Sequence, residues 1–531
     1  MNKRPADGRE RTATTTSAAP TARDSSLAEL KVILRGAAFA AAGLLLSKLF
    51  FYATRLAVAR LGVEDYGLFS IALLTANFAF LIAVLGVDQA LLTHVSQYAA
   101  KRDYPRLRAV VRTGFKIALP ASVATGALLF LAAPFLAESV FHAPRLQLLL
   151  EIMAFGVPLT VFTMMCAAIF RGLKRVELEA GVRSVAENAF KLAFVAGLVH
   201  AAGWGVQGAA VGIVAGAGAA AAIAWLVLKK TLPRAHETAA YLPAKTGEYP
   251  AAKLLNFSLP LALVAIAYAA IPWIATTQLG ISKTPAEVGV LNAASPTGEL
   301  MLLLPLMLFA LFIPALSSLT TGNRKAVRQT FSHITKWVFM ASLPLALLLS
   351  YYATQVLTLL FGSQYAQGAA SLQVIVAGYL AYSLLLPAVL LLQVLNRPRS
   401  ILASVTVGVL ACAAAGAVLT PVYGTLGAAA SIAIAMAAYG ATGALMAKRA
   451  YSVSITSRYH VRIAAAGIIA LAILSQADNL VTSHPLAEMA FLSLLFLAVY
   501  APLLHAFKCF DDEDNDIMHA TLRKLARMMG K

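Results

Sequence analysis

The chain has 531 residues, of which 60% are hydrophobic and only 13% charged, and its mean hydropathy is +0.76. This composition excludes a soluble globular protein and predicts an all-α, polytopic integral membrane protein. The formal net charge of +19 would suggest nucleic-acid binding in a soluble protein, and three cysteines are too few for a disulfide framework or a metal site.

Apolar windows separated by polar breaks predict about fourteen transmembrane helices, since a bilayer core about 30 Å thick takes about 20 apolar residues per span. The first 30 residues are polar and lack an apolar run, so we expect the first span, rather than a cleavable signal, to direct insertion. In chain order the predicted spans are 36–59, 66–87, 112–134, 148–170, 182–201, 206–228, 255–280, 288–317, 336–360, 370–395, 400–419, 425–446, 461–477 and 486–507.

The basic residues are distributed asymmetrically between the loops. Most of the 43 Lys and Arg residues lie in the two tails and in the loops after even-numbered spans. The opposite loops hold only Arg60, Arg145 and Lys283. The positive-inside rule therefore places both termini in the cytoplasm, and it accounts for the positive charge without nucleic acid.

Each tail carries a pattern typical of a helix on the membrane surface. Ser26 and Glu29 form a capping box ahead of an apolar stripe. Near the other end an acidic stretch, residues 511–516, precedes apolar residues interleaved with Arg523, Lys524 and Arg527. Acids at a helix start and bases along an apolar face favour an amphipathic helix on an anionic cytoplasmic surface.

The chain repeats itself at a spacing of about 220 residues. The segment from Trp204 to Ala210 resembles the segment from Tyr423 to Ala429, and Tyr66-Gly67 resembles Val288-Gly289. Because each copy holds six spans, the copies share one orientation and are related by a pseudo-twofold axis along the membrane normal.

This repeat predicts two six-helix lobes followed by two further helices, an arrangement found in alternating-access carriers. Prolines inside many spans, including Pro120, Pro260 and Pro387, favour a carrier over the alternative of a scaffold or channel. The predicted domains are 1–35, a cytoplasmic tail with an interfacial helix; 36–228, the N-lobe; 229–254, a cytoplasmic linker; 255–447, the C-lobe; 448–507, spans 13 and 14; and 508–531, a cytoplasmic tail with an amphipathic helix.

Three segments carry a family resemblance. Residues 59–69 (ARLGVEDYGLF), 360–365 (LFGSQY) and 421–429 (PVYGTLGAA) are similar to motifs of the polysaccharide flippases, a family of the multidrug/oligosaccharidyl-lipid/polysaccharide exporter superfamily. Many members have an acid just before the Leu-Gly of span seven, where this chain has Gln278. That departure puts in doubt any cation coupling that uses the acid.

The resemblance implies a flippase that moves polyprenyl-pyrophosphate-linked oligosaccharide, such as an O-antigen or exopolysaccharide repeat unit, from the cytoplasmic to the outer leaflet of a bacterial inner membrane. It implies no enzymatic activity and no cofactor, and it leaves H⁺ or Na⁺ coupling open. The implied partners are the lipid-linked oligosaccharide, the membrane, and a polysaccharide polymerase with its chain-length regulator; nucleic acid is not one of them.

Three cations fall inside predicted spans: Lys48, Arg55 and Lys191. Lys48 and Arg55 are seven residues apart, about two turns, and so share one helix face. Because a charge at mid-span costs about 2.5–3.5 kcal/mol, it usually faces a cavity or a partner. We predict that these cations bind the substrate pyrophosphate; the alternative is that Lys48 pairs internally and Arg55 reaches the outer surface.

Two acids in the spans are candidates for a charge network or for ion coupling. Glu187 precedes Lys191 by four residues, the favourable order for a helical ion pair. Glu299, in span eight, is a candidate protonatable group, and the alternative is an acid that braces two helices by hydrogen bonds.

Other functions are weighed against the flippase. The chain has no phosphate-binding Gly-x-x-x-x-Gly-Lys-Ser/Thr loop, which argues against an ATP-driven pump. A membrane glycan polymerase or ligase needs clustered catalytic groups, whereas the external loops carry scattered ones. A cation-coupled drug antiporter would favour acids in its cavity, while a flippase for the peptidoglycan lipid precursor handles the same substrate chemistry and stays open.

Overall fold

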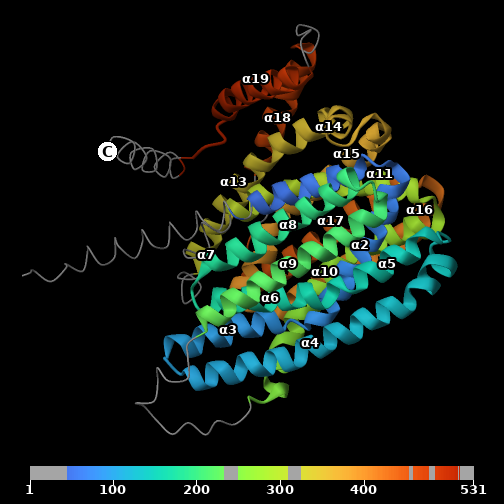
Figure 1. Ribbon diagram of the computed structural model, residues 1–531. Helices are drawn as coiled ribbons and strands as arrows, with labels where there is room; N and C mark the ends of the chain where they lie inside the picture. The colour runs from blue at the N-terminus through green and yellow to red at the C-terminus, as the bar shows by residue number, and fades with distance from the viewer. Residues whose placement is uncertain are drawn as a thin grey trace, which may run out of the picture.

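The computed structural model describes residues 43, 45–232, 249–308, 324–451, 453, 458–477, 485–511 and 514. The described part is a bundle of helices, with α4 at one edge and α18 and α19 at the other (Figure 1). The predicted surface helices of the two tails, and most of the predicted linker, lie outside the described residues.

The helices of the first half account for six predicted spans. Residues 45–59 are helical, and they are followed by α2 (Val63–Val84), α3 (Val87–Ala100), α4 (Tyr104–Phe135) with η1 (Leu136–Val140), α5 (Arg145–Ala154), α6 (Gly156–Gly172), α7 (Val176–Glu179), η2 (Ala180–Ala186), α8 (Glu187–Ala196), η3 (Gly197–Ala201) and α9 (Gly205–Thr231).

The second half supplies the remaining spans. The elements are α10 (Ala251–Ser282), α11 (Pro285–Glu299), η5 (Leu300–Leu302), α13 (Arg324–Tyr351), α14 (Ala353–Phe361), η6 (Ser363–Gly368), α15 (Ala369–Val394), α16 (Pro398–Tyr423), α17 (Thr425–Tyr451), α18 (Arg458–Ala477) and α19 (Pro485–Ala506).

Twelve described helical segments are long and apolar enough to cross a membrane. Residues 45–59 and 176–201 are helical at the predicted first and fifth spans, so the prediction of about fourteen spans is confirmed. Several helices run further than predicted; α4, for example, begins at Tyr104 rather than at 112. Hydropathy marks only the part of a helix that lies in hydrocarbon, so it misses polar turns beyond the membrane.

The repeat has a structural counterpart in the backbone. Gly205 and Gly424, 219 residues apart, both adopt a positive φ, of 59° and 56°. Three residues after each, a Cβ on Gly427 would overlap the Leu419 carbonyl, and a Cβ on Gly208 would lie 2.8 Å from the Trp204 Cβ and 3.1 Å from the Leu198 carbonyl oxygen. Glycine is the residue that tolerates both conditions, so the two copies start their sixth helix in the same way.

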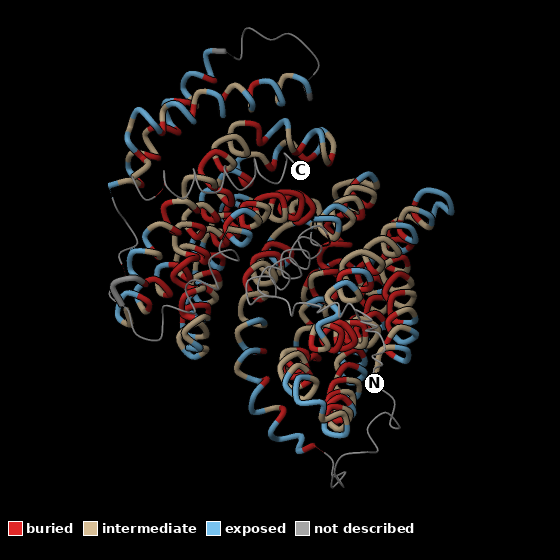
Figure 2. Tube along the Cα trace, turned by 90° about the vertical axis from the view of Figure 1, so that its left-hand side faces the viewer, coloured by how far each residue is buried: buried red, intermediate tan, exposed pale blue. Residues whose placement is uncertain are grey.

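Helix packing follows the same duplication. In the first half α9 packs against α6 and α8, and in the second half α17 packs against α15 and α16 in the same relation. Buried residues line the helix faces that are turned toward one another, and exposed residues follow the rim of the bundle (Figure 2). In lipid this rim is apolar, as expected for helices that associate by close packing of small residues.

Candidate functional site

A cavity opens among helices of the first half. Its volume is about 770 Å³ when the open space at its mouth is counted. Its wall combines aromatic rings, such as Phe51 and Phe80, with six polar side chains, namely Thr54, Arg55, Asn77, Thr160, Asn188 and Lys191. The cavity therefore offers hydrogen-bond donors and positive charge within an apolar surrounding.

Arg55 lies at one end of this cavity and is only 4% exposed. Its Nη1 donates to the Tyr66 hydroxyl at 3.1 Å and to the Asn292 carbonyl at 3.2 Å. The guanidinium also lies 4.7 Å from the centroid of the Phe51 ring. The buried Arg55 Nε has no hydrogen-bond partner, which leaves one donor of the group unused in this conformation. Arg55 is thus buried between helices and does not reach the outer surface.

Lys191 lies on α8 and reaches the same cavity. Its Nζ is 2.6 Å from Glu187 Oε1, as the i,i+4 spacing predicts, and Glu187 is 6% exposed. Gly216 of α9 positions this turn, because a Cβ there would lie 2.6 Å from the Lys191 backbone nitrogen. Next to it Asn188 donates to the Ser47 hydroxyl at 3.1 Å. Close packing of α8 on α9 therefore fixes a cation and an amide at the cavity wall.

Lys48 and Glu299 form an ion pair between the two halves. The Lys48 Nζ lies 3.6 Å from Glu299 Oε1, and the two side chains are 34% and 44% exposed. Glu299 and Asn292 are seven residues apart on α11, as Lys48 and Arg55 are on the first helix. Lys48 contacts Glu299 and Arg55 contacts Asn292, so the two helices run antiparallel along this contact. The lining of the cavity includes Arg55 and Lys191 but not Lys48 or either acid.

The two halves are in tight contact at the end where α2 and α11 begin. A Cβ on Gly67 would fall on the Pro285 carbonyl oxygen, and a Cβ on Gly289 would fall on the Val63 carbonyl oxygen. These contacts are reciprocal, as a pseudo-twofold axis between two copies requires. The Tyr365 hydroxyl adds a hydrogen bond of 3.0 Å to the Ala59 carbonyl. The two halves are therefore closed against each other here, and we call this the closed end.

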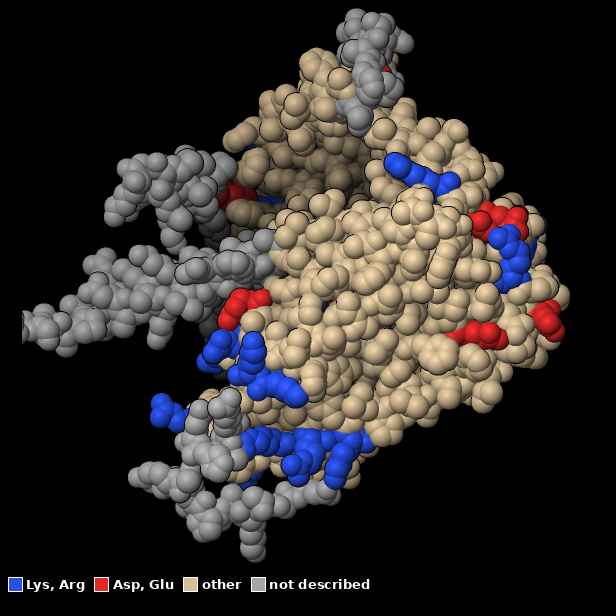
Figure 3. All heavy atoms as spheres, viewed as in Figure 1, with Lys and Arg blue, Asp and Glu red and all other residues tan. Residues whose placement is uncertain are grey.

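Basic side chains gather at the opposite end, where α4 begins (Figure 3). We call it the basic end and define it by its exposed residues Lys101, Arg102, Arg106, Lys174, Arg175, Lys229 and Lys230. At the closed end Arg145 is instead paired with Asp65 at 2.7 Å and with Glu64 at 3.6 Å. The charges thus distinguish the two ends of the bundle.

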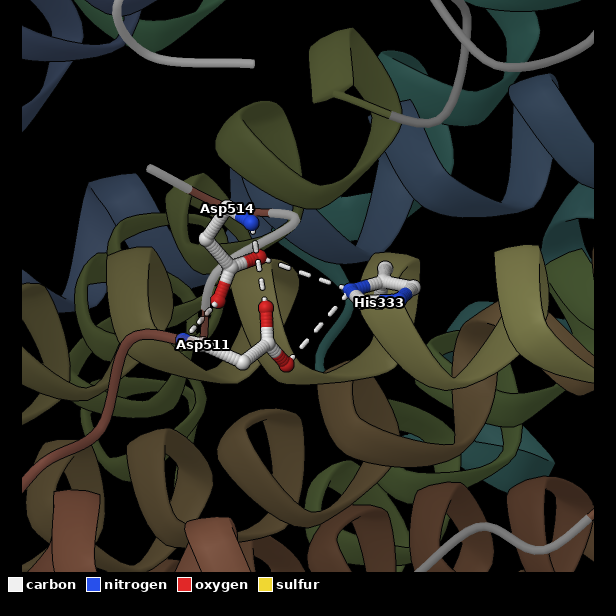
Figure 4. A group of neighbouring side chains, drawn as sticks. All are labelled: His333, Asp511 and Asp514. Carbon is white, nitrogen blue, oxygen red and sulfur yellow. Dashed lines mark hydrogen bonds and ion pairs between the residues drawn. The ribbon is translucent and has the colours of Figure 1, made fainter. Parts of the chain in front are cut away.

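A second charged cluster joins α13 to the segment that follows α19. His333 Nδ1 lies 3.4 Å from Asp514 Oδ1 and 4.0 Å from Asp511 Oδ2 (Figure 4). These three residues are the group within the described chain whose ligand atoms lie close enough to hold a metal ion. The ammonium of Lys336, however, contacts both carboxylates, at 2.8 Å from Asp511. A cation of the protein itself therefore already occupies the space between the two carboxylates.

Burial alone would raise the pKa of Asp514, but hydrogen bonds from Lys336, the Asp511 backbone and Trp337 outweigh it and lower the pKa to about 2. Lys336 and Asp514 are 2% and 1% exposed. We call this group the ionic clasp. It fastens the segment after α19 to α13, and so holds the last two helices against the second half.

Sequence reasoning missed several of these residues. Asn292 is a lone amide in an apolar helix, a signal that could have been read, and Tyr66 stands inside the family motif. The clasp gave no signal, because Lys336 and Asp511 are separated by 175 positions in the sequence.

The sequence is similar to a family of known proteins. A family model described as "Polysaccharide biosynthesis protein" matches residues 57–370. No curated protein matches the sequence.

Solved structures share the fold at low sequence identity. The lipid II flippase MurJ, in an inward closed conformation, has a TM-score of 0.67 at 14% identity, over 90% of this chain and 99% of that one. An inward-facing multidrug resistance MATE family transporter of the MOP superfamily has a TM-score of 0.64 at 16% identity, over 76% and 94%. A MOP superfamily transporter from Pyrococcus furiosus has a TM-score of 0.53 at 18% identity, over 80% and 96%.

Proposed function

We propose that this chain, which belongs to the polysaccharide biosynthesis protein family and has the fold of MOP superfamily transporters, is a flippase for lipid-linked oligosaccharide. Its substrate is a sugar chain joined to a polyprenyl carrier by a pyrophosphate, and it moves the polar part across the membrane. The protein acts as a carrier and forms no covalent bond with the substrate.

The observation that carries this proposal is the cavity that Arg55 and Lys191 line together. An unpaired ionised group costs many kcal/mol to bury in hydrocarbon, so a pyrophosphate crosses only where fixed cations and donors replace its water. Two cations against one neighbouring acid, Glu187, leave the wall net positive. The amides and hydroxyls of Asn77, Asn188 and Thr160 suit a hydroxyl-rich glycan.

The closed end and the basic end support alternating access. We infer that the basic end faces the cytoplasm of a bacterium, because Lys and Arg concentrate on the cytoplasmic side of membrane proteins. Both termini are then cytoplasmic, and the cavity takes up substrate from the inner leaflet while the contact between α2 and α11 closes the outer side. Transport would exchange the two states by a rocking of one half against the other.

A second candidate is transport of the peptidoglycan lipid precursor. The likeness to MurJ extends over 90% of this chain, and it is a likeness of fold alone. Both substrates carry a polyprenyl pyrophosphate, so the same cations serve either one. The distinction lies in the sugars. A polysaccharide polymerase and its chain-length regulator would be partners only under our first proposal.

The test is transport of a fluorescent polyprenyl-pyrophosphoryl oligosaccharide in proteoliposomes. The informative variant is the double substitution Glu187→Gln with Lys191→Gln, which removes the cavity cation without leaving a buried carboxylate unpaired. Lys230→Gln is the matched control, because it removes an exposed charge outside the cavity. We expect transport to fall at least tenfold in the double variant and to be unchanged in the control.

Equal transport by the wild type and the double variant would contradict the role of the cavity. Faster transport of the peptidoglycan precursor than of the oligosaccharide carrier would favour the second candidate. Extension of the glycan by the purified protein would instead show an enzyme.

A further inference from the structure

Helix α4 is longer than a membrane span requires. Its 32 residues extend over about 48 Å at 1.5 Å per residue, whereas the hydrocarbon core is about 30 Å thick. The excess lies at the basic end, where the helix begins with the N-cap Asp103, whose side chain accepts from the Arg106 backbone. The first turns therefore stand in the interfacial region, and one side of them is basic.

Three basic residues follow one another on α4 at intervals of four: Arg108, Arg112 and Lys116. Residues four apart lie one above the other on the same helix face. Arg112 and Lys116 are exposed, and Arg108 is partly exposed. The positive-inside rule explains why this end is basic, but it does not explain why these three share one face.

An apolar groove lies further along the same helix. It measures about 710 Å³, counting its open side, and it is lined by Val123, Ala127, Phe130 and Leu131 of α4 and by Phe155 and Pro158. The groove exists because the chain turns at Phe155, between α5 and α6, while Gly126 lets α4 approach the Ala154 carbonyl. Val123 and Phe155 are 59% and 63% exposed, so the groove opens toward the lipid.

The basic residues and the groove share one face of α4. At 3.6 residues per turn, the following residues fall within a sector of about 100°: Arg108, Arg112, Lys116, Val123, Ala127 and Phe130. By the same count Leu131 lies about 40° beyond this sector and Arg106 and Ala124 about 60° beyond it, and neither Arg106 nor Ala124 lines the groove. A basic segment near the membrane surface, followed by an apolar groove inside the membrane, is complementary to the charged headgroup and the chain of an anionic lipid.

We propose that this face of α4 is a docking site for the polyprenyl-pyrophosphate carrier before it enters the cavity, which rests on the proposed function. The basic residues take the pyrophosphate and the groove takes the chain. From Lys116 to Leu131 the face extends about 22 Å, at 1.5 Å per residue, beyond the midplane of a core about 30 Å thick. An acyl chain confined to one leaflet fills only the near part, whereas a long polyprenyl chain fills it all.

The experiment measures binding at equilibrium, without transport. The full chain in phosphatidylcholine nanodiscs is photolabelled with a polyprenyl pyrophosphate that carries a diazirine along its chain, and the labelled residues are identified by mass spectrometry. We expect labels between Val123 and Leu131. The variant Arg112→Gln with Lys116→Gln should weaken labelling about 30-fold, the equivalent of about 1 kcal/mol for each basic residue near the surface.

Matched variants separate the face from the general charge of this end. Arg106→Gln removes one exposed charge from α4 outside this sector and should leave labelling nearly unchanged. Ala127→Trp fills the groove and should abolish labelling there, while Ala124→Trp, at an exposed position that does not line the groove, should not. Thermal unfolding of each variant shows that the protein is folded.

Three results would overturn the proposal. Equal loss from Arg106→Gln and from the double variant would reduce the site to a diffuse basic surface. Competition by phosphatidylglycerol at the same concentration would assign the face to ordinary anionic lipid, and competition by inorganic pyrophosphate would show that the groove contributes nothing. If the proposed function fails but the label still maps to the groove, the face is a polyprenyl site of a protein that does not flip this substrate.

Discussion

Each half of the molecule has a lysine within a membrane helix, but Lys191 is partly exposed whereas Lys336 is buried, and their surroundings differ. In the first half Lys191 stands beside Arg55 at a cavity, and its carboxylate partner is four residues away on the same helix. In the second half Lys336 is 2% exposed and is held by Asp511 and Asp514 of a distant segment. A lysine lines a cavity in one half, and a lysine forms the ionic clasp in the other. A cation within a membrane helix of this fold is therefore not by itself evidence of a substrate site.

The interiors of the two halves also differ in the kind of side chain that they contain. The second half has a cluster of tyrosines in its interior: the buried Tyr382 stacks on the buried Tyr439 with ring centroids 5.1 Å apart, and the partly buried Tyr268 lies edge-on to Tyr439 at 6.3 Å. Aromatic packing stabilises a helix bundle without fixed charge. Duplication thus preserved the backbone and changed the chemistry, which the following predictions test.

The largest effect is expected at the ionic clasp. Replacing Lys336 with Met leaves two carboxylates without their cation, and such a change costs about 3–5 kcal/mol. We expect a clear fall in the thermal unfolding temperature in detergent, with little change for Lys448→Met, an exposed control on α17. Adding Asp511→Asn and Asp514→Asn should restore part of the loss. Unchanged stability in Lys336→Met would remove the contrast between the halves.

The next effect concerns the cavity. Arg55→Met removes a cation from the cavity wall, and a hydrogen bond from a charged group to the substrate is worth about 1.5–3 kcal/mol, so substrate binding should weaken about 10- to 100-fold. Arg55→Lys keeps the charge but loses the planar guanidinium. Its affinity for the substrate should therefore lie between those of the wild type and of Arg55→Met. Binding of the polyprenyl-pyrophosphate carrier to purified variants measures this, with Arg60→Met as the exposed control. Equal binding by all variants would make Arg55 a purely structural residue.

A smaller effect is expected where the halves meet. Gly289→Ala places a Cβ on the Val63 carbonyl, so α2 and α11 must move apart at a cost of about 1–3 kcal/mol. In a chain without its native cysteines, a cysteine at Ala59, which is fully buried, should then react faster with a membrane-impermeant thiol reagent. Gly197→Ala, where a Cβ meets nothing, is the control. If the cysteine at position 59 reacts slowly in both glycine variants, the glycine contacts are not what keeps this end closed.

The smallest effect is that of pH on the clasp. Because the folded-state pKa of Asp514 is about 2, below its ordinary value of 3.8, the clasp contributes its full stability above about pH 4 and loses it as pH falls toward 2. Between pH 5 and 8 we expect no change in unfolding temperature from this group. A transition in that range that Asp514→Asn abolishes would contradict the assignment.

Much of this protein was predictable from local sequence. Hydropathy located the spans, because every backbone polar group in lipid must be satisfied within its own helix. The repeat was visible because both copies need glycine at the same strained turn, Gly205 and Gly424. The i,i+4 spacing predicted the pair of Glu187 and Lys191, since a helix fixes that distance by itself.

Tertiary structure decided which partner each intramembrane charge meets. Sequence placed Lys48 and Arg55 on one face, yet only the packing of α11 gave Lys48 a carboxylate and Arg55 a carbonyl, and left Arg55 at a cavity that Lys48 does not line. The clasp joins residues 175 positions apart. Such contacts depend on how helices cross, which is set by side-chain packing along whole helices and leaves no local pattern in the chain.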